Sequence, residues 1–220
     1  MKRALVVALV LAVCNALSLR PQTALQPLGW LPLLIGYALL TTYALVRLHK
    51  EGVLLQRLSI KSGDLSVGVV LGFTLLGTAW LVKTRLIPAD SVREAWTWQI
   101  HALLHSLPGP LPQAALLVPV GLMEEIVWRG FIAHDLKEQL GRRRALPLAA
   151  ALYAASLLPT VFTMSDPQAG PNPLLVLAAL GCGVVWTFLA LQTERLIAVT
   201  VSHLALIYFV SAPLGAWQIL

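Results

Sequence analysis

The chain has 220 residues, of which 58% are hydrophobic and only 12% are charged, and its mean hydropathy is +0.78. A soluble domain of this length carries about 25% charged residues, so the composition excludes an ordinary soluble protein. The net charge of +6 is typical of a membrane protein with Lys and Arg in its cytoplasmic loops, and we prefer this interpretation to nucleic-acid binding.

Apolar runs that approach the roughly 20 residues needed to cross a bilayer recur along the chain. The first run follows Lys2 and Arg3 and fits either a signal peptide or a first span. Val13 fits poorly in front of Cys14 as part of a cleavage site, so we favour a retained span. We predict seven spans, at residues Ala4–Leu19, Gly29–Val46, Leu65–Val82, Leu111–Ala133, Ala145–Met164, Leu174–Leu191 and Leu196–Ala212.

The positive charges orient these spans. If the N-terminus is cytoplasmic, most of the 16 Lys and Arg residues fall in the segments on the inner side of the membrane. This asymmetry is the one expected for cytoplasmic loops. The predicted fold is therefore an all-α, polytopic transmembrane helical bundle of about seven spans, with the N-terminus inside and the C-terminus outside.

The segment Ser91–Pro110 lies between the third and fourth predicted spans. Trp96 and Trp98 suit a helix that lies at the outer membrane interface. His101 and His105 are four residues apart, a spacing that can bind a metal ion. Because no third ligand is nearby, we favour an interfacial pair over a metal site.

Two adjacent acids interrupt the fourth span, in the stretch LLVPVGLMEEIVWRGFIAHDL. If Glu124 and Glu125 lay in a loop, the preceding Leu111–Met123 would be too short to cross the membrane. An ionised acid near the middle of a bilayer costs on the order of 2.5–3.5 kcal/mol, so both acids need partners or water. Glu125 and Arg129 share a helical face and are expected to pair, whereas Glu124 points about 100° away. The spacing alone fits either a structural ion pair or a general base on water.

A histidine in the last span bears on this choice. His203 stands in the apolar stretch LIAVTVSHLALIYFV. Glu124 is expected roughly 13 Å, and His203 roughly 10 Å, from the cytoplasmic ends of their helices, at 1.5 Å per residue. We therefore expect the two side chains to lie at the same depth and to form one site.

The stretch MEEIVWRG resembles the EExxxR signature of the CAAX protease and bacteriocin-processing (CPBP) family of glutamic-type intramembrane proteases. The resemblance covers Leu111 to Phe209, and includes the late motif LALQTERLIAVTVSHLAL. It implies one integrated domain, with N-terminal spans and an interfacial helix at 1–110 and a protease core at 111–220. It also implies an integral protein of a bacterial inner (cytoplasmic) membrane.

The same resemblance assigns roles to four side chains. Glu124 would activate water for attack on a peptide bond, Glu125 with Arg129 would orient the site, and His203 would help bind water or the oxyanion. The substrate would be a membrane-associated protein or peptide tail. No cofactor, metal ion or nucleic acid is required by this interpretation.

Two positions depart from the family pattern. The second motif keeps its aromatic residue at Tyr153 but has Leu157 where the family has a histidine, and Ile207 stands where the final motif often has asparagine. These departures leave a second hypothesis, a catalytically inactive membrane binding, immunity or scaffold protein. A transporter is a weaker third possibility, because no inverted repeat is visible.

Overall fold

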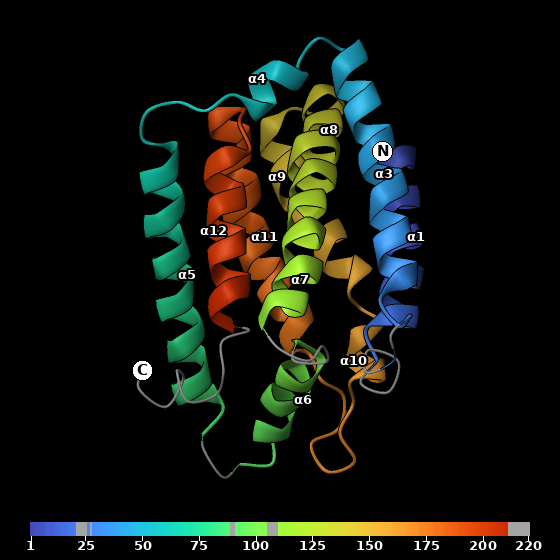
Figure 1. The fold of residues 1–220 in the computed structure, drawn as a ribbon, viewed down its shortest axis with the longest axis vertical. Helices are drawn as coiled ribbons and strands as arrows, with labels where there is room; N and C mark the ends of the chain where they lie inside the picture. The colour runs from blue at the N-terminus through green and yellow to red at the C-terminus, as the bar shows by residue number, and fades with distance from the viewer. Residues whose placement is uncertain (21–25, 27, 89–90, 105–109, 211–220) are drawn as a thin grey trace.

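A computed structural model describes all residues except 21–25, 27, 89–90, 105–109 and 211–220. Within the described residues, every regular element is a helix (Figure 1). The elements in chain order are α1 (Lys2–Ser18), α3 (Leu31–Lys50), α4 (Leu54–Leu58), α5 (Asp64–Leu86), α6 (Glu94–Leu104), α7 (Pro110–Glu125), η1 (Ile126–Ile132), α8 (Ala133–Leu140), α9 (Arg142–Ser156), α10 (Thr160–Thr163), α11 (Leu174–Thr193) and α12 (Ile197–Val210).

Four helical segments are long and apolar enough to cross a membrane, namely Leu31–Lys50, Asp64–Leu86, Arg142–Thr163 and Leu174–Thr193. They correspond to the second, third, fifth and sixth predicted spans. The other predicted spans correspond to α1, to the series α7–η1–α8, and to α12, which has 14 residues. The all-helical fold with several candidate membrane spans is therefore confirmed, whereas the number of seven spans and the orientation of the N-terminus stay predictions.

Two predicted spans differ from the structure in their course. The fifth was expected as one helix to Met164, but α9 ends at Ser156 and a turn separates it from α10. Pro159 accounts for the break, because it has no backbone N–H and its ring clashes with the preceding turn. The fourth was expected to end at Ala133, but its helical path continues through η1 and α8 to Leu140.

The π-helix η1 lies in the middle of the bundle. It contacts α3, α9 and α11, as well as α7 and α8 on either side of it in the chain. Trp128, Arg129 and Ile132 on this segment are 0–1% exposed. A π-helical turn within an α-helix is frequent at functional sites, and here it directly follows the two adjacent acids.

The N-terminal helix α1 packs into the same core. Ala4 and Leu11 are fully buried, and α1 contacts α3 and α9. Near the C-terminal end of α1, Asn15 donates a hydrogen bond from Nδ2 to the Ser156 carbonyl at 2.9 Å. The first apolar run is therefore part of the helical bundle, and its retention as a span stays a prediction.

The helix α5 packs mainly against α12. A Cβ at Gly68 would lie 2.7 Å from the Ala198 carbonyl oxygen, so the missing side chain allows the two backbones to approach closely. At one end of α5, Asp64 forms two hydrogen bonds to the Arg195 guanidinium, at 2.7 and 3.0 Å. Glycine contacts of this kind are typical of helix pairs in membranes.

The short helix α6 lies at the opposite end of the bundle from α4 (Figure 1). Its Trp96 donates a hydrogen bond from Nε1 to the Gly170 carbonyl at 3.3 Å, and Asn172 donates one from Nδ2 to the Trp96 carbonyl at 3.0 Å. Trp98 is 52% exposed, as expected for an interfacial tryptophan. His101 lies on this helix, whereas His105 lies outside the described residues.

Candidate active site

The two adjacent acids occupy the last two positions of α7 and have different surroundings. The side chain of Glu125 is 1% exposed and that of Glu124 is 16% exposed. Arg129 on η1 is fully buried, and its Nη1 lies 3.2 Å from Glu125 Oε1. The expected pairing between these two residues is thus present, in a place where a single unpaired charge would be costly.

His203 on α12 lies between the two carboxylates. Its Nδ1 is 2.7 Å from Glu125 Oε1, and its Nε2 is 3.4 Å from Glu124 Oε2. The structure therefore brings together all four residues named from the sequence, including the two expected at equal depth. Because Glu125 also accepts from Arg129, His203 is placed to donate from Nδ1 and to direct Nε2 toward Glu124.

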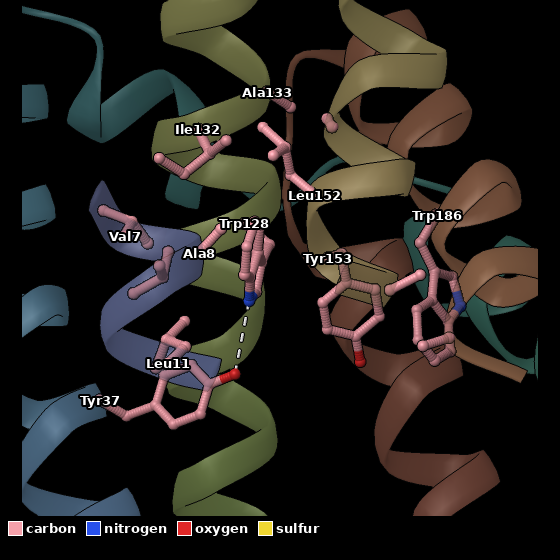
Figure 2. Packing of buried hydrophobic residues seen from close by; sticks show 14 of the residues in the cluster. Val7, Ala8, Leu11, Tyr37, Trp128, Ile132, Ala133, Leu152, Tyr153 and Trp186 are labelled. Carbon is pink, nitrogen blue, oxygen red and sulfur yellow. Dashed lines mark hydrogen bonds between the residues drawn. The ribbon is translucent and has the colours of Figure 1, made fainter. Parts of the chain in front are cut away.

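Aromatic rings enclose the guanidinium and the imidazole. The Arg129 guanidinium lies over the Tyr153 ring at 4.2 Å and 5.0 Å from the Trp186 ring centre. Trp186 also stacks on His203, with ring centroids 4.2 Å apart, and donates from Nε1 to Ser202 at 3.1 Å. Figure 2 shows Tyr153 and Trp186 on neighbouring helices in this part of the core. These contacts fix the plane of the imidazole relative to the carboxylates.

Several buried polar atoms around η1 have no hydrogen-bond partner within the described residues. They are Oε2 of Glu125, Nε and Nη2 of Arg129, and Oγ1 of Thr41 on α3. A buried polar group without a partner is rare in folded proteins and costs about 1–3 kcal/mol. The centre of the bundle therefore retains hydrogen-bonding capacity that its own side chains do not use.

The segment that contains the two acids and His203 is similar to a known family. Residues 106–209 match the family model described as Type II CAAX prenyl endopeptidase Rce1-like. The matched model describes a CAAX protease (CPBP) family, and the match covers a little less than half of the 220-residue chain. No curated protein and no solved structure gives a significant match. The matched segment agrees with the stretch from Leu111 to Phe209 that resembles this family in sequence.

The two departures from the CPBP pattern occupy apolar surroundings. Leu157 follows the last residue of α9 and packs, partly buried, against the core. Ile207 is one turn beyond His203, and its Cδ1 would lie 3.0 Å from a Cβ at Gly121 on α7. Neither side chain brings a hydrogen-bonding atom, so any additional polar group must come from elsewhere.

One polar contact to the carboxylates was missed by sequence reasoning. Tyr37 on α3 donates a hydrogen bond from its hydroxyl to Glu124 Oε1 at 2.8 Å. Trp128 donates from Nε1 to the Tyr37 hydroxyl at 3.4 Å (Figure 2). Tyr37 lies outside the segment matched to the CPBP family. Its signal in the sequence is a lone tyrosine in the apolar run LPLLIGYALL.

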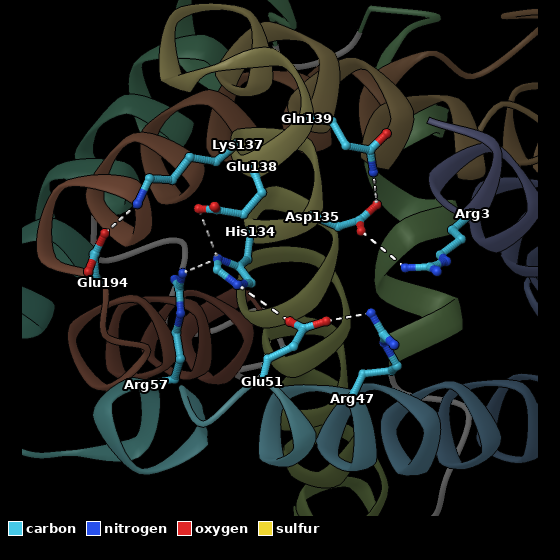
Figure 3. A network of polar contacts seen from close by, with 10 residues as sticks. All are labelled: Arg3, Arg47, Glu51, Arg57, His134, Asp135, Lys137, Glu138, Gln139 and Glu194. Carbon is cyan, nitrogen blue, oxygen red and sulfur yellow. Dashed lines mark hydrogen bonds and ion pairs between the residues drawn. The ribbon is translucent and has the colours of Figure 1, made fainter.

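A second polar cluster, the α8 cluster, lies away from this site at the end of the bundle that carries α4. It combines ion pairs and hydrogen bonds between α3, α4, α8 and the turn before α12 (Figure 3). A cavity of about 370 Å³ adjoins it. Its members are Arg47, Glu51, Arg57, His134, Lys137 and Glu194.

The histidine of the α8 cluster has a lowered pKa. Arg57 is 2% exposed and donates from Nη2 to His134 Nδ1 at 2.9 Å. His134 Nε2 lies 3.6 Å from Glu51 Oε2. Burial and the Arg57 charge together lower the pKa of His134, although the nearby Glu51 and Glu138 carboxylates oppose that effect. Sequence reasoning missed this cluster, because its members come from four separate segments.

Proposed function

We propose that this protein is an intramembrane endopeptidase that hydrolyses a peptide bond in a membrane-associated protein or peptide tail. The observation that carries the proposal is His203, which touches two carboxylates of unequal exposure. Glu125 is sealed and paired with Arg129, so it has a positioning role. Glu124 keeps partial exposure and is therefore the acid that can meet water.

The charges at the site support this division of roles. Two carboxylates and one guanidinium leave a net charge of about −1 if the imidazole is neutral. One proton shared between Glu124 and His203 makes the site electroneutral, which an apolar interior strongly favours. The two atoms that would share it, Glu124 Oε2 and His203 Nε2, are 3.4 Å apart. Two such groups can move protons to and from a reacting peptide by general acid–base catalysis.

In the proposed reaction, Glu124 takes a proton from water while the water oxygen forms a bond to the peptide carbonyl carbon. His203, protonated at Nε2, donates a hydrogen bond to the oxyanion that develops. The proton held by Glu124 then passes to the peptide nitrogen as the C–N bond breaks. The products are a new carboxylic acid, which keeps the second proton of the water until it ionises, and a new amine, and Glu124 returns to its ionised state.

The surrounding structure supports the binding of a polar backbone. The unpartnered nitrogen atoms of Arg129 and the hydroxyl of Thr41 are on elements that adjoin the two acids. A peptide carbonyl is an acceptor for donors of this kind. A purely structural ion-pair cluster has no need for buried donors that lack partners, whereas a substrate-binding site does.

We further propose seven spans with a cytoplasmic N-terminus, in a bacterial inner membrane. In this topology α4 and the junction of α8 with α9 face the cytoplasm, where the run Arg142–Arg144 meets anionic lipid. The matched family is named for CAAX prenyl endopeptidases. A prenylated peptide tail, presented at the membrane, is therefore the substrate class that we propose.

The test uses purified protein in liposomes and a farnesylated CAAX peptide with a fluorophore and a quencher on either side of the expected cleavage site. We expect the wild-type protein to cleave this peptide, and Glu124→Gln to lose at least about 100-fold in rate, since a general base contributes about 10²–10⁴-fold. The control is Glu138→Gln, on α8, whose side chain is 62% exposed and does not touch the two acids.

Two results would overturn the proposal. Equal cleavage by the wild type and Glu124→Gln would remove Glu124 from the chemistry. Failure of well-folded wild-type protein to cleave the peptide would exclude the proposed substrate class and favour an inactive scaffold or immunity protein.

A further inference from the structure

We propose that Tyr37 is a positioning residue for the reaction at Glu124. This inference rests on the proposed function, and it concerns a residue outside the segment that matches the CPBP family. Tyr37 is contributed by α3, in the N-terminal half of the chain. It would make that half a part of the catalytic machinery.

The contacts of the Tyr37 hydroxyl define its role. The side chain is buried, at 1% exposure, on the face of α3 that packs against η1. The hydroxyl donates its one hydrogen to Glu124 Oε1 at 2.8 Å. It also accepts from Trp128 Nε1 at 3.4 Å. The hydroxyl oxygen is therefore held in place from both sides, by the carboxylate that it donates to and by the indole that it accepts from.

This hydrogen bond makes the two oxygens of Glu124 different. Oε1 is occupied by Tyr37, whereas Oε2 faces His203 Nε2 at 3.4 Å. Oε2 is therefore the oxygen that can take the proton from water, and it lies on the side of the imidazole that would donate to the oxyanion. Without the hydroxyl, the carboxylate could rotate about its terminal bond, which has a broad energy profile. A small misplacement of a catalytic group costs up to about 100-fold in rate.

Tyr37 provides a polar group at a site where the residue at the family's histidine position is apolar. The CPBP family places a histidine at the position of Leu157, which here offers no hydrogen-bonding atom. Tyr37 supplies a polar group to the site from α3 instead of α9. The site can therefore hold its base in place although one motif residue is missing.

A simpler explanation is that Glu124 merely satisfies a buried tyrosine, since buried tyrosine hydroxyls usually find a partner. The two explanations differ in their consequences for kinetics. A structural hydrogen bond affects the amount and stability of folded protein. A positioning bond affects kcat and leaves KM unchanged, because the substrate is bound equally well but reacts more slowly.

The experiment measures kcat and KM on the farnesylated CAAX peptide in liposomes, with folded protein quantified in each sample. We expect Tyr37→Phe to lower kcat by about 10- to 100-fold with KM unchanged, which corresponds to the loss of one well-placed hydrogen bond. Incorporation of 3-fluorotyrosine at position 37 keeps the hydroxyl and should retain most of the activity. The matched control is Tyr43→Phe, on the same helix, because Tyr43 is 44% exposed and packs edge-on against Phe131.

The outcomes separate this inference from the proposed function. If Glu124→Gln is inactive but Tyr37→Phe keeps kcat within twofold of the wild type, the inference is wrong and the proposed function stands. If the well-folded wild type does not cleave the peptide, the proposed function fails, and the inference that rests on it fails with it.

Discussion

Replacement of Arg129 by methionine tests the buried ion pair at the centre of the site. The substitution keeps a long apolar side chain but removes the charge that pairs with Glu125 at 3.2 Å. Both residues are 0% exposed, so water cannot replace the lost partner. We expect a large loss of stability, and we expect part of it to return when the charge of Glu125 is also removed.

The size of the effect follows from the contacts. Breaking a buried pair by removing one partner costs about 3–5 kcal/mol. His203 still binds Glu125 Oε1 at 2.7 Å, which moves the loss toward the lower limit. The guanidinium also leaves its place over the Tyr153 ring, a cation–π contact worth about 2 kcal/mol when desolvated. We therefore expect a total of about 5 kcal/mol, or a fall in melting temperature of about 10–20 °C for a chain of this size.

The assay is thermal unfolding of the purified protein in detergent. The double variant Arg129→Met with Glu125→Gln should be more stable than Arg129→Met alone, because glutamine removes the unpaired charge and keeps an acceptor for His203. The control is Arg47→Met, which breaks a pair with Glu51 of the same spacing but with about one third of each side chain exposed. It should cost less than about 1 kcal/mol. Strict additivity of the two site substitutions would refute the pairing.

Three further predictions concern the rest of the molecule. Gly68→Ala should lower the melting temperature, because the new Cβ would lie 2.7 Å from a carbonyl oxygen of α12. Gly77→Ala should be tolerated, because no atom lies within 4 Å of its new Cβ, and similar effects of the two substitutions would contradict the close packing of α5 and α12. Because the pKa of His134 is lowered in the folded protein, the unfolded chain binds a proton at this residue more readily, and stability should fall as the pH drops below about 6.5. His134→Gln should weaken this pH dependence in melting curves from pH 8 to pH 5, and an unchanged dependence would refute the explanation. A topology reporter at Gly141 should report a cytoplasmic location and one after Leu220 a non-cytoplasmic one. Identical locations would exclude the three spans predicted between Gly141 and Leu220.

The sequence predicted those parts of the site in which a charged or polar residue lies within an apolar run. Glu124, Glu125 and Arg129 stand out because charge within a span is expensive and needs a reason. The helical repeat then predicts which of them pair, and the rise per residue predicts that His203 lies at the same depth. These inferences use only distances along single helices, which explains their agreement with the structure.

Contacts between aromatic side chains and the charged groups could not be predicted in the same way. Tyr37 is 87 residues from Glu124 in the sequence, and a tyrosine or tryptophan in an apolar run is as common in a lipid-facing position as in a site. The packing between helices decides which helix faces contact η1. This packing cannot be read from the pattern of residues along a single helix. The same limit applies to Trp186, whose stacking on His203 requires the relative rotation of α11 and α12.

The course of individual helices was predicted to different extents. The apolar runs located the helices, since length and hydropathy reflect the thickness of the bilayer. The break between α9 and α10 was missed although Pro159 marks it, because the apolar run continues on both sides of the proline. The π-helix η1 has no signature in the pattern, since one extra residue in a turn changes the direction of side chains and not their composition.

The central claim is that Glu124 makes this protein a protease, and the most direct test requires no choice of substrate. New protein termini in the membrane fraction are compared between cells that produce the wild-type protein and cells that produce equal amounts of folded Glu124→Gln. The account predicts a set of termini that occurs only with the wild type, because glutamine keeps the shape of the site but cannot take a proton from water. Identical sets of termini from both strains would contradict it and would leave Glu124 as a structural residue of a non-catalytic protein.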